Sequence, residues 1–85
     1  MTFALGTDVS RAETEHGTVL LDQRRGRYFQ LNSSGTFILR TLLNGVTPDH
    51  TAEVLSECYG VDRDRAHADV ASLVDSLLTK GLARA

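Results

Sequence analysis

The residues that most often do chemistry are few in this chain and lie far apart. The sequence contains one cysteine, Cys58, and three histidines, His16, His50 and His67. A nucleophilic thiol needs a base beside it, and a helical metal site typically needs two ligands one turn apart. None of these residues has such a partner in the sequence, and Cys58 has no second cysteine for a disulfide or a zinc site. We therefore predict that the protein is not an enzyme and carries no metal and no cofactor.

Length and composition describe one small domain. The chain has 85 residues, of which 41% are hydrophobic and 24% are charged, and its formal net charge is −2. A domain of this size has a thin core with little room for an enclosed active site, which favours binding over catalysis. Its apolar runs are far shorter than the roughly 20 residues of a membrane span, and no signal-peptide pattern precedes them. We expect a single domain over residues 1–85, cytoplasmic and without a membrane partner.

Three segments in the first third of the chain have the character of β-strands. They are Val9 to Thr14, a β-favouring run from Thr18 to Leu21, and Arg27 to Leu31. The glycines between them, Gly17 and Gly26, mark two hairpin turns. The pattern predicts a three-stranded antiparallel meander.

The remainder of the chain predicts three helices. The cluster Asn32-Ser33-Ser34 is a typical helix start, and Asn44-Gly45 a typical stop. Thr47 and Pro48 start a second helix that ends at Gly60, and Asp62 starts a third that ends at Gly81. Cys58 falls one turn after Leu55 on the apolar side of the second helix, so we expect it to be buried. The third helix has a wide apolar face, formed by Ala66, Val70, Leu73 and Leu77 with Ala71, Val74 and Leu78 beside them.

The third strand is an edge of this meander and has little protection against pairing with another chain. The first strand carries Asp8, Arg11 and Glu13 along or beside it, whereas the third has only Arg27 near its start, before Tyr28 and Phe29. Charged residues are a common means of blocking an open edge. Because Tyr28 and Phe29 point to opposite faces, only one of them can enter a thin core. We therefore expect a groove between the third strand and the third helix.

An ordered set of short motifs spans about residues 8 to 82 of the chain. The motifs are Gly17-Thr18-Val19-Leu20-Leu21-Asp22, Gly26-Arg27-Tyr28-Phe29-Gln30-Leu31-Asn32, Gly35, Leu39, Leu42-Leu43, Gly45, Tyr59-Gly60-Val61, Asp69-Val70, Leu73, Leu77 and Gly81-Leu82. This set resembles the PqqD-like family of small winged-helix domains, known as RiPP recognition elements, which bind the leader segment of a ribosomally made precursor peptide before it is modified. Within the family, the chain looks most like the free-standing recognition proteins of lasso-peptide clusters.

The resemblance implies a winged-helix-like α+β fold, with a three-stranded antiparallel sheet followed by three helices. It also implies that a leader peptide adds as a strand to the third strand and lays side chains against the third helix. The partners it implies are a separate transglutaminase-like leader peptidase and the macrocyclase. Carried over to this chain, the leader-binding residues are Arg27, Tyr28, Phe29, Gln30, Leu31, Asp69, Val70, Leu73, Val74 and Leu77.

Several of these residues also have a simpler interpretation. Tyr28 and Phe29 would be one core residue and one half-exposed aromatic if the family pattern were set aside. Arg24, Arg25 and Arg27 fit a solvated hairpin turn as well as a site that steers an acidic partner. Asp69 is equally consistent with a contact to the leader and with an ordinary exposed helix acid.

DNA binding by a winged-helix regulator is the alternative function. Three helices beside a small sheet can place the third helix in a major groove. That helix and its start carry four acids against two arginines, whereas DNA binders concentrate positive charge on the docking face. These residues are Asp62, Asp64, Asp69, Asp75, Arg63 and Arg65. Composition therefore disfavours nucleic acid as a partner.

Overall fold

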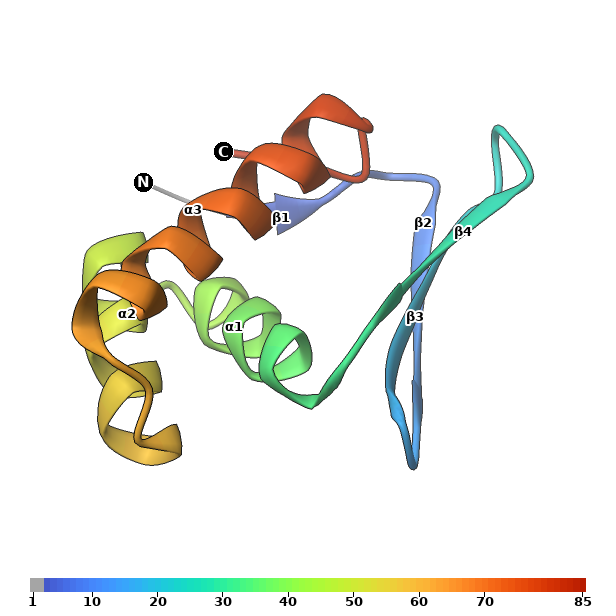
Figure 1. Cartoon of the computed structure of the whole chain (residues 1–85). Helices are drawn as coiled ribbons and strands as arrows, with labels where there is room; N and C mark the ends of the chain where they lie inside the picture. The colour runs from blue at the N-terminus through green and yellow to red at the C-terminus, as the bar shows by residue number, and fades with distance from the viewer. Residues whose placement is uncertain (1–2) are drawn as a thin grey trace.

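The computed structural model describes residues 3–85 and has the predicted α+β architecture (Figure 1). A three-stranded sheet precedes three helices, and a short strand near each terminus adds a second, two-stranded sheet. The elements are β1 (Ala4–Leu5), β2 (Val9–Thr14), β3 (Gly17–Asp22), β4 (Arg27–Leu31), α1 (Ser33–Leu43), α2 (Pro48–Tyr59), α3 (Arg63–Thr79) and β5 (Ala83–Arg84).

The predicted meander is confirmed, with the strand order β2-β3-β4 and antiparallel pairing throughout. Thr18, Leu20 and Asp22 on the central strand are buried, which identifies the face of the sheet that meets the helices. Gly17 starts this strand at a φ of +137°, where a Cβ would lie 2.0 Å from the carbonyl oxygen of Leu31. Only glycine fits this close approach between β3 and β4.

The helix boundaries follow the predicted capping residues. The Asn32 side chain accepts a hydrogen bond from the Gly35 N–H, and Thr47 accepts one from the His50 N–H. Gly60 ends α2 in the left-handed conformation that favours glycine. Asp62 occupies the N-cap position of α3, but its side chain makes no capping hydrogen bond there.

The sequence analysis did not predict the small second sheet. β1 pairs antiparallel with β5, so that Ala4 lies opposite Arg84 and Leu5 opposite Ala83. Two residues per strand are too few to produce a recognisable alternation of apolar and polar side chains. This sheet places Phe3 and Leu82 in the core and fixes the chain that follows α3.

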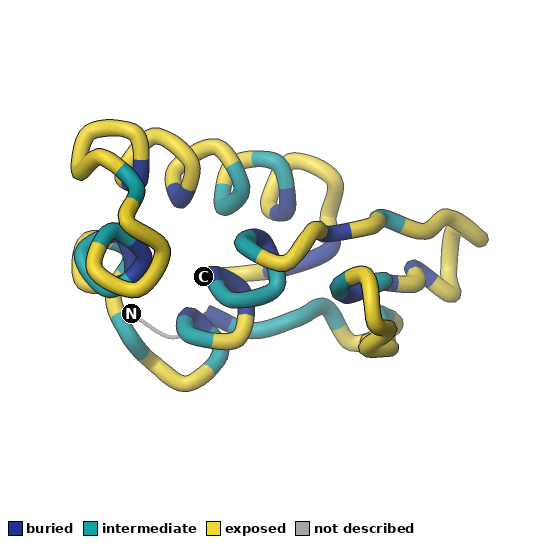
Figure 2. The backbone as a smooth tube through the Cα atoms, turned by 60° about the horizontal axis from the view of Figure 1, so that its bottom comes forward, coloured by how far each residue is buried: buried dark blue, intermediate teal, exposed yellow. Residues whose placement is uncertain are grey.

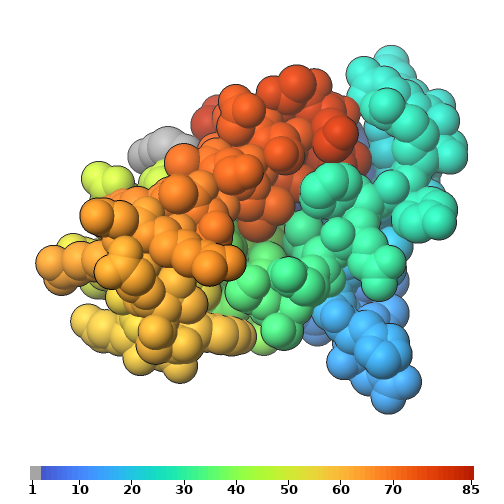
Figure 3. All heavy atoms as spheres, in the orientation of Figure 1, coloured from blue at the N-terminus to red at the C-terminus, as the bar shows by residue number. Residues whose placement is uncertain are grey.

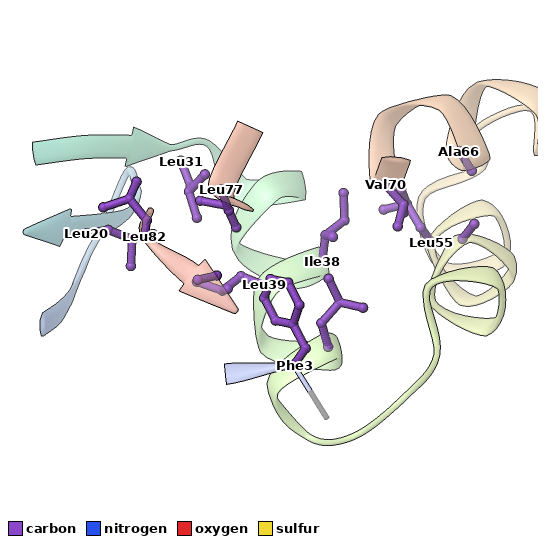
Figure 4. Close-up of a cluster of buried hydrophobic side chains, with 13 residues drawn as sticks. Phe3, Leu20, Leu31, Ile38, Leu39, Leu55, Ala66, Val70, Leu77 and Leu82 are labelled. Carbon is purple, nitrogen blue, oxygen red and sulfur yellow. The ribbon is translucent and has the colours of Figure 1, made fainter. Parts of the chain in front are cut away.

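The core lies between the three helices and the inner face of the sheet (Figures 2 and 4). Figure 2 shows the buried positions on the inward sides of the helices, while most of the meander's length is exposed. Figure 4 places Leu31 of β4 beside Leu77 of α3, and Val70 of α3 beside Leu55 of α2. No helix within residues 3–85 is long and apolar enough to span a membrane.

The prediction that Cys58 is buried is wrong, because its side chain is exposed. It lies seven residues after the buried Thr51, on the same side of α2, so the helical periodicity by itself places it inward. Leu55 is the last buried residue of α2, however, and both Cys58 and Tyr59 in the final turn are exposed. The apolar stripe therefore continues one turn beyond the packed part of the helix.

Candidate functional site

The outer edge of β4 carries backbone groups that no other strand of residues 3–85 pairs with. The N–H of Gln23 donates to the carbonyl oxygen of Asp8 at 2.9 Å, so the backbone of Gln23 faces the β2 side. Backbone groups alternate between the two sides along a strand, so Asp22, Leu20 and Thr18 face β4. They pair with Arg27, Phe29 and Leu31 respectively.

The two residues of β4 between these partners therefore point their backbone away from the sheet. They are Tyr28 and Gln30, and each presents one N–H and one C=O at the open edge. By the same alternation, Arg11 points its backbone groups to the opposite edge of the sheet, because its partner Leu20 faces β4. The meander thus has two open edges. A hollow of about 220 Å³ lies near the end of β2 at Glu13 and Thr14, and a larger groove lies along the edge of β4.

A groove of about 420 Å³ runs along this edge between β4, the start of α1 and α3. Its apolar wall contains Phe29, Leu31, Ile38 and Leu73. Figure 3 shows β4 and the start of α1 at the surface beside α3, with no other segment covering them in this view. The expected groove between the third strand of the meander and the third helix is thus present.

The strand residues divide between the two faces of the sheet as their alternation requires. Phe29 is half-buried on the face that meets α3, and Leu31 beside it is 4% exposed and belongs to the core. Tyr28 lies on the outer face opposite Leu21, and is 74% exposed. The aromatic that lines the groove with its side chain is therefore Phe29, while Tyr28 contributes its backbone to the edge.

The five helix residues implied by the resemblance do not all reach the groove. Asp69 and Leu73 line it. Val70 and Leu77 are 1% and 0% exposed, and Val74 is partly buried against the same core. Val70 and Leu77 therefore offer no surface to a ligand in this structure, and Val74, although partly exposed, does not line the groove.

Polar residues complete the groove and were missed by the sequence analysis. Arg65, Ser72 and Ser76 line it from α3, and Asn32 and Ser34 line it from the start of α1. The α3 residues share one helical face with Asp69 and Leu73, so helical spacing from these two residues could have predicted that they line the groove. Because they are polar, they lie outside the apolar stripe on which the prediction rested. The Arg65 Nε lies 3.8 Å from the Asp69 carboxylate, which balances the charge at this end.

The β3–β4 hairpin is joined to the end of α3 by Arg25. Its guanidinium donates to the Asp22 carboxylate at 3.2 Å and to the carbonyl oxygen of Lys80 at 3.3 Å. Burial raises the pKa of Asp22, but hydrogen bonds from the backbone and side chain of Arg25, its charge and the Arg24 N–H outweigh burial, so the pKa lies below its usual value. Arg25 is thus a structural residue and not only part of a solvated turn.

The chemistry available along this edge is that of binding. The groove offers unpaired backbone groups, an apolar wall and a few hydroxyls. Within residues 3–85, no group of three or more histidine, cysteine, aspartate or glutamate side chains is placed to hold a metal ion. An extended peptide strand is the ligand that matches an open strand edge beside such a groove.

Comparison with known proteins supports this assignment. A lasso peptide synthetase B1 complexed with the leader peptide is 41% identical, with a TM-score of 0.93 over 100% of both chains. TbiB1 in complex with the TbiA(beta) leader peptide is 27% identical, with a TM-score of 0.85 over 95% of this chain and 94% of that one.

A third structure shares the fold at lower identity. It is the PqqD truncation of Methylobacterium extorquens PqqCD, described as a stand-alone RiPP recognition element; it is 22% identical, with a TM-score of 0.72 over 98% of this chain and 88% of that one. The search of curated proteins found no match. The family model for coenzyme PQQ synthesis protein D matches residues 17–83, which is most of the chain. The resemblance inferred from the sequence is therefore confirmed, and the chain belongs to the PqqD family.

Proposed function

We propose that this protein binds the leader segment of a ribosomally synthesised precursor peptide, as a strand added to β4. The observation that carries the proposal is the open edge of β4, where the backbones of Tyr28 and Gln30 point outward beside the groove. The two similar structures that contain leader peptides support a leader as the ligand, and the one named as a lasso peptide synthetase supports a lasso-peptide precursor.

Backbone pairing alone is too weak to explain useful affinity. The N–H and C=O groups of two residues give four hydrogen bonds, each contributing about 0.5–1.5 kcal/mol net. Their sum is about 2–6 kcal/mol, whereas a 1 μM complex requires about 8 kcal/mol in addition to the entropic cost of association. Apolar side chains of the leader must therefore enter the groove and contact Phe29, Ile38 and Leu73, which line it.

In this proposal the protein performs no chemistry and presents the precursor to other enzymes. A bound leader places the rest of the precursor at a high effective concentration near any enzyme that also docks on the complex. The enzymes we propose are a transglutaminase-like leader peptidase and the macrocyclase. Because the ribosome makes the precursor, we place this encounter in the cytoplasm.

A binding titration with a matched pair of variants tests the proposal. Isothermal titration is performed with the N-terminal half of the precursor encoded beside this gene. Leu73→Glu places a charge in the apolar wall and is expected to abolish binding, as is Phe29→Glu. Leu78→Glu makes the same change on an exposed residue of α3 that does not line the groove, and is expected to bind as the wild type does.

Circular dichroism of each variant separates loss of binding from loss of fold, since Phe29 and Leu73 also pack against the core. The proposal is wrong if the wild-type protein shows no binding at about 100 μM peptide, a concentration that detects interactions of about 5.5 kcal/mol. It is also wrong if Leu73→Glu folds and binds with unchanged affinity.

A further inference from the structure

A second, smaller hollow continues the groove beyond Phe29. It has a volume of about 130 Å³ and is lined by Arg27, Tyr28, Phe29, Lys80 and Leu82. Phe29 lines both hollows, so the two follow one another along β4. Arg27 and Phe29 lie on the same face of the strand, because side chains two residues apart share a face. A strand added to this edge would therefore meet both hollows with side chains on one of its faces.

This hollow has two positive charges and no negative one. Arg27 and Lys80 both line it, and within residues 3–85 neither side chain lies within 4.0 Å of a carboxylate. Asp22, which pairs with Arg27 across the strands, is engaged by Arg25. At the other end of the groove, by contrast, Arg65 is balanced by Asp69.

The surrounding contacts fix the backbone positions of these two residues. The Lys80 Nζ lies 5.8 Å from the centroid of the Phe29 ring, within the range of a cation–π contact. The carbonyl oxygen of Lys80 accepts the hydrogen bond from Arg25, whose guanidinium also lies against Gly81. The base of Arg27 is fixed by its pairing with Asp22 in the hairpin. The backbones of Arg27 and Lys80 are therefore already in position before a ligand enters the hollow.

We propose that this hollow binds the carboxylate of an aspartate or glutamate in the leader peptide. The inference rests on the proposed leader binding and adds one specificity position to it. Antiparallel pairing is the more stable arrangement per residue, so the leader runs from beside Leu31 towards Arg27. Its inward side chains then lie opposite Leu31, Phe29 and Arg27 in turn. The acid is the residue opposite Arg27, two positions C-terminal to the residue opposite Phe29.

Paired glutamate and glutamine substitutions in the peptide test this position. The probe is a fluorescein-labelled N-terminal half of the precursor encoded beside this gene, with each residue replaced in turn by Glu and by Gln. We expect one position at which the Glu peptide binds about fivefold more tightly than its Gln counterpart, the gain of a partly exposed ion pair. In Arg27→Gln and in Lys80→Gln, the ratio at that position falls towards one.

Arg24→Gln is the matched control, because Arg24 is an exposed arginine of the same hairpin that does not line the hollow. It makes the same change in net charge and is expected to keep the fivefold ratio. The inference is overturned if the wild type shows no glutamate preference at any position, if the preference survives both Arg27→Gln and Lys80→Gln, or if Arg24→Gln removes it equally. Failure of every peptide to bind the wild type would instead overturn the proposed function, and this inference with it.

Discussion

Replacing Gln30 by proline isolates the contribution of the β4 backbone to binding. The N–H of Gln30 points to the open edge, so its loss removes no hydrogen bond from the β3–β4 ladder. Proline is tolerated on edge strands when the missing N–H faces away from the sheet. A bound leader, however, loses one backbone hydrogen bond, which contributes about 0.5–1.5 kcal/mol. The proline ring also occupies space where the partner carbonyl must approach.

We therefore expect Gln30→Pro to raise the Kd for the leader about twofold to tenfold, the range that corresponds to one lost hydrogen bond. The steric effect of the ring adds to this. The assay is isothermal titration of wild type and variant with the N-terminal half of the precursor, combined with thermal unfolding. Arg11→Pro is the control, since it removes an N–H that points to the opposite open edge, on β2. The reasoning is refuted if both variants keep their fold and bind equally well, or if Arg11→Pro weakens binding as much as Gln30→Pro.

Three further perturbations test the fold and the alternative function. Gly17→Ala should lower the free energy of unfolding in urea by about 3 kcal/mol or more, because its Cβ would lie 2.0 Å from the Leu31 oxygen. Gly26→Ala is the control, since a Cβ there would have no neighbour within 4 Å. It should cost only the left-handed backbone strain of about 1–2 kcal/mol. The pKa of Asp22 is lowered in the folded state. The ionised carboxylate therefore stabilises the fold at pH values above its unfolded pKa of about 3.9, and this stabilisation is lost as the pH falls through the folded pKa. The difference in unfolding temperature between the wild type and Asp22→Asn should accordingly narrow below about pH 4. Labelled duplex DNA should show no binding to the protein in fluorescence polarisation, and the affinity for the leader should weaken only modestly with added salt. DNA binding whose affinity falls steeply with salt would instead support the winged-helix regulator.

Local signals were sufficient to predict most of the fold. Each large helix begins at a residue whose type favours that position, and Thr47 followed by Pro48 is the clearest case. The strands were recognisable because glycines separate their β-favouring runs. The β1–β5 sheet was not predicted, because its two-residue strands are far apart in the chain and are too short to show a periodicity of their own.

The candidate site was predicted as a location more successfully than as a set of side chains. An open strand beside an apolar helix follows from the order of the elements, but the direction in which each α3 residue points depends on how the helix is rotated against its neighbours. That rotation buries Val70 and Leu77 and turns Ser72 and Ser76 to the groove. Cys58 illustrates the same limit, because periodicity gives the side of a helix and not where its neighbour ends.

The outward-facing backbone of β4 has a consequence for the evolution of such a pathway. Every residue except proline carries the same backbone N–H and C=O groups, so the backbone hydrogen bonds that an added strand makes at this edge depend little on which residues it carries. Selection then acts on a leader chiefly through the few side chains that enter the groove. A precursor gene can duplicate and diverge over the rest of its length while one recognition protein continues to serve all the copies.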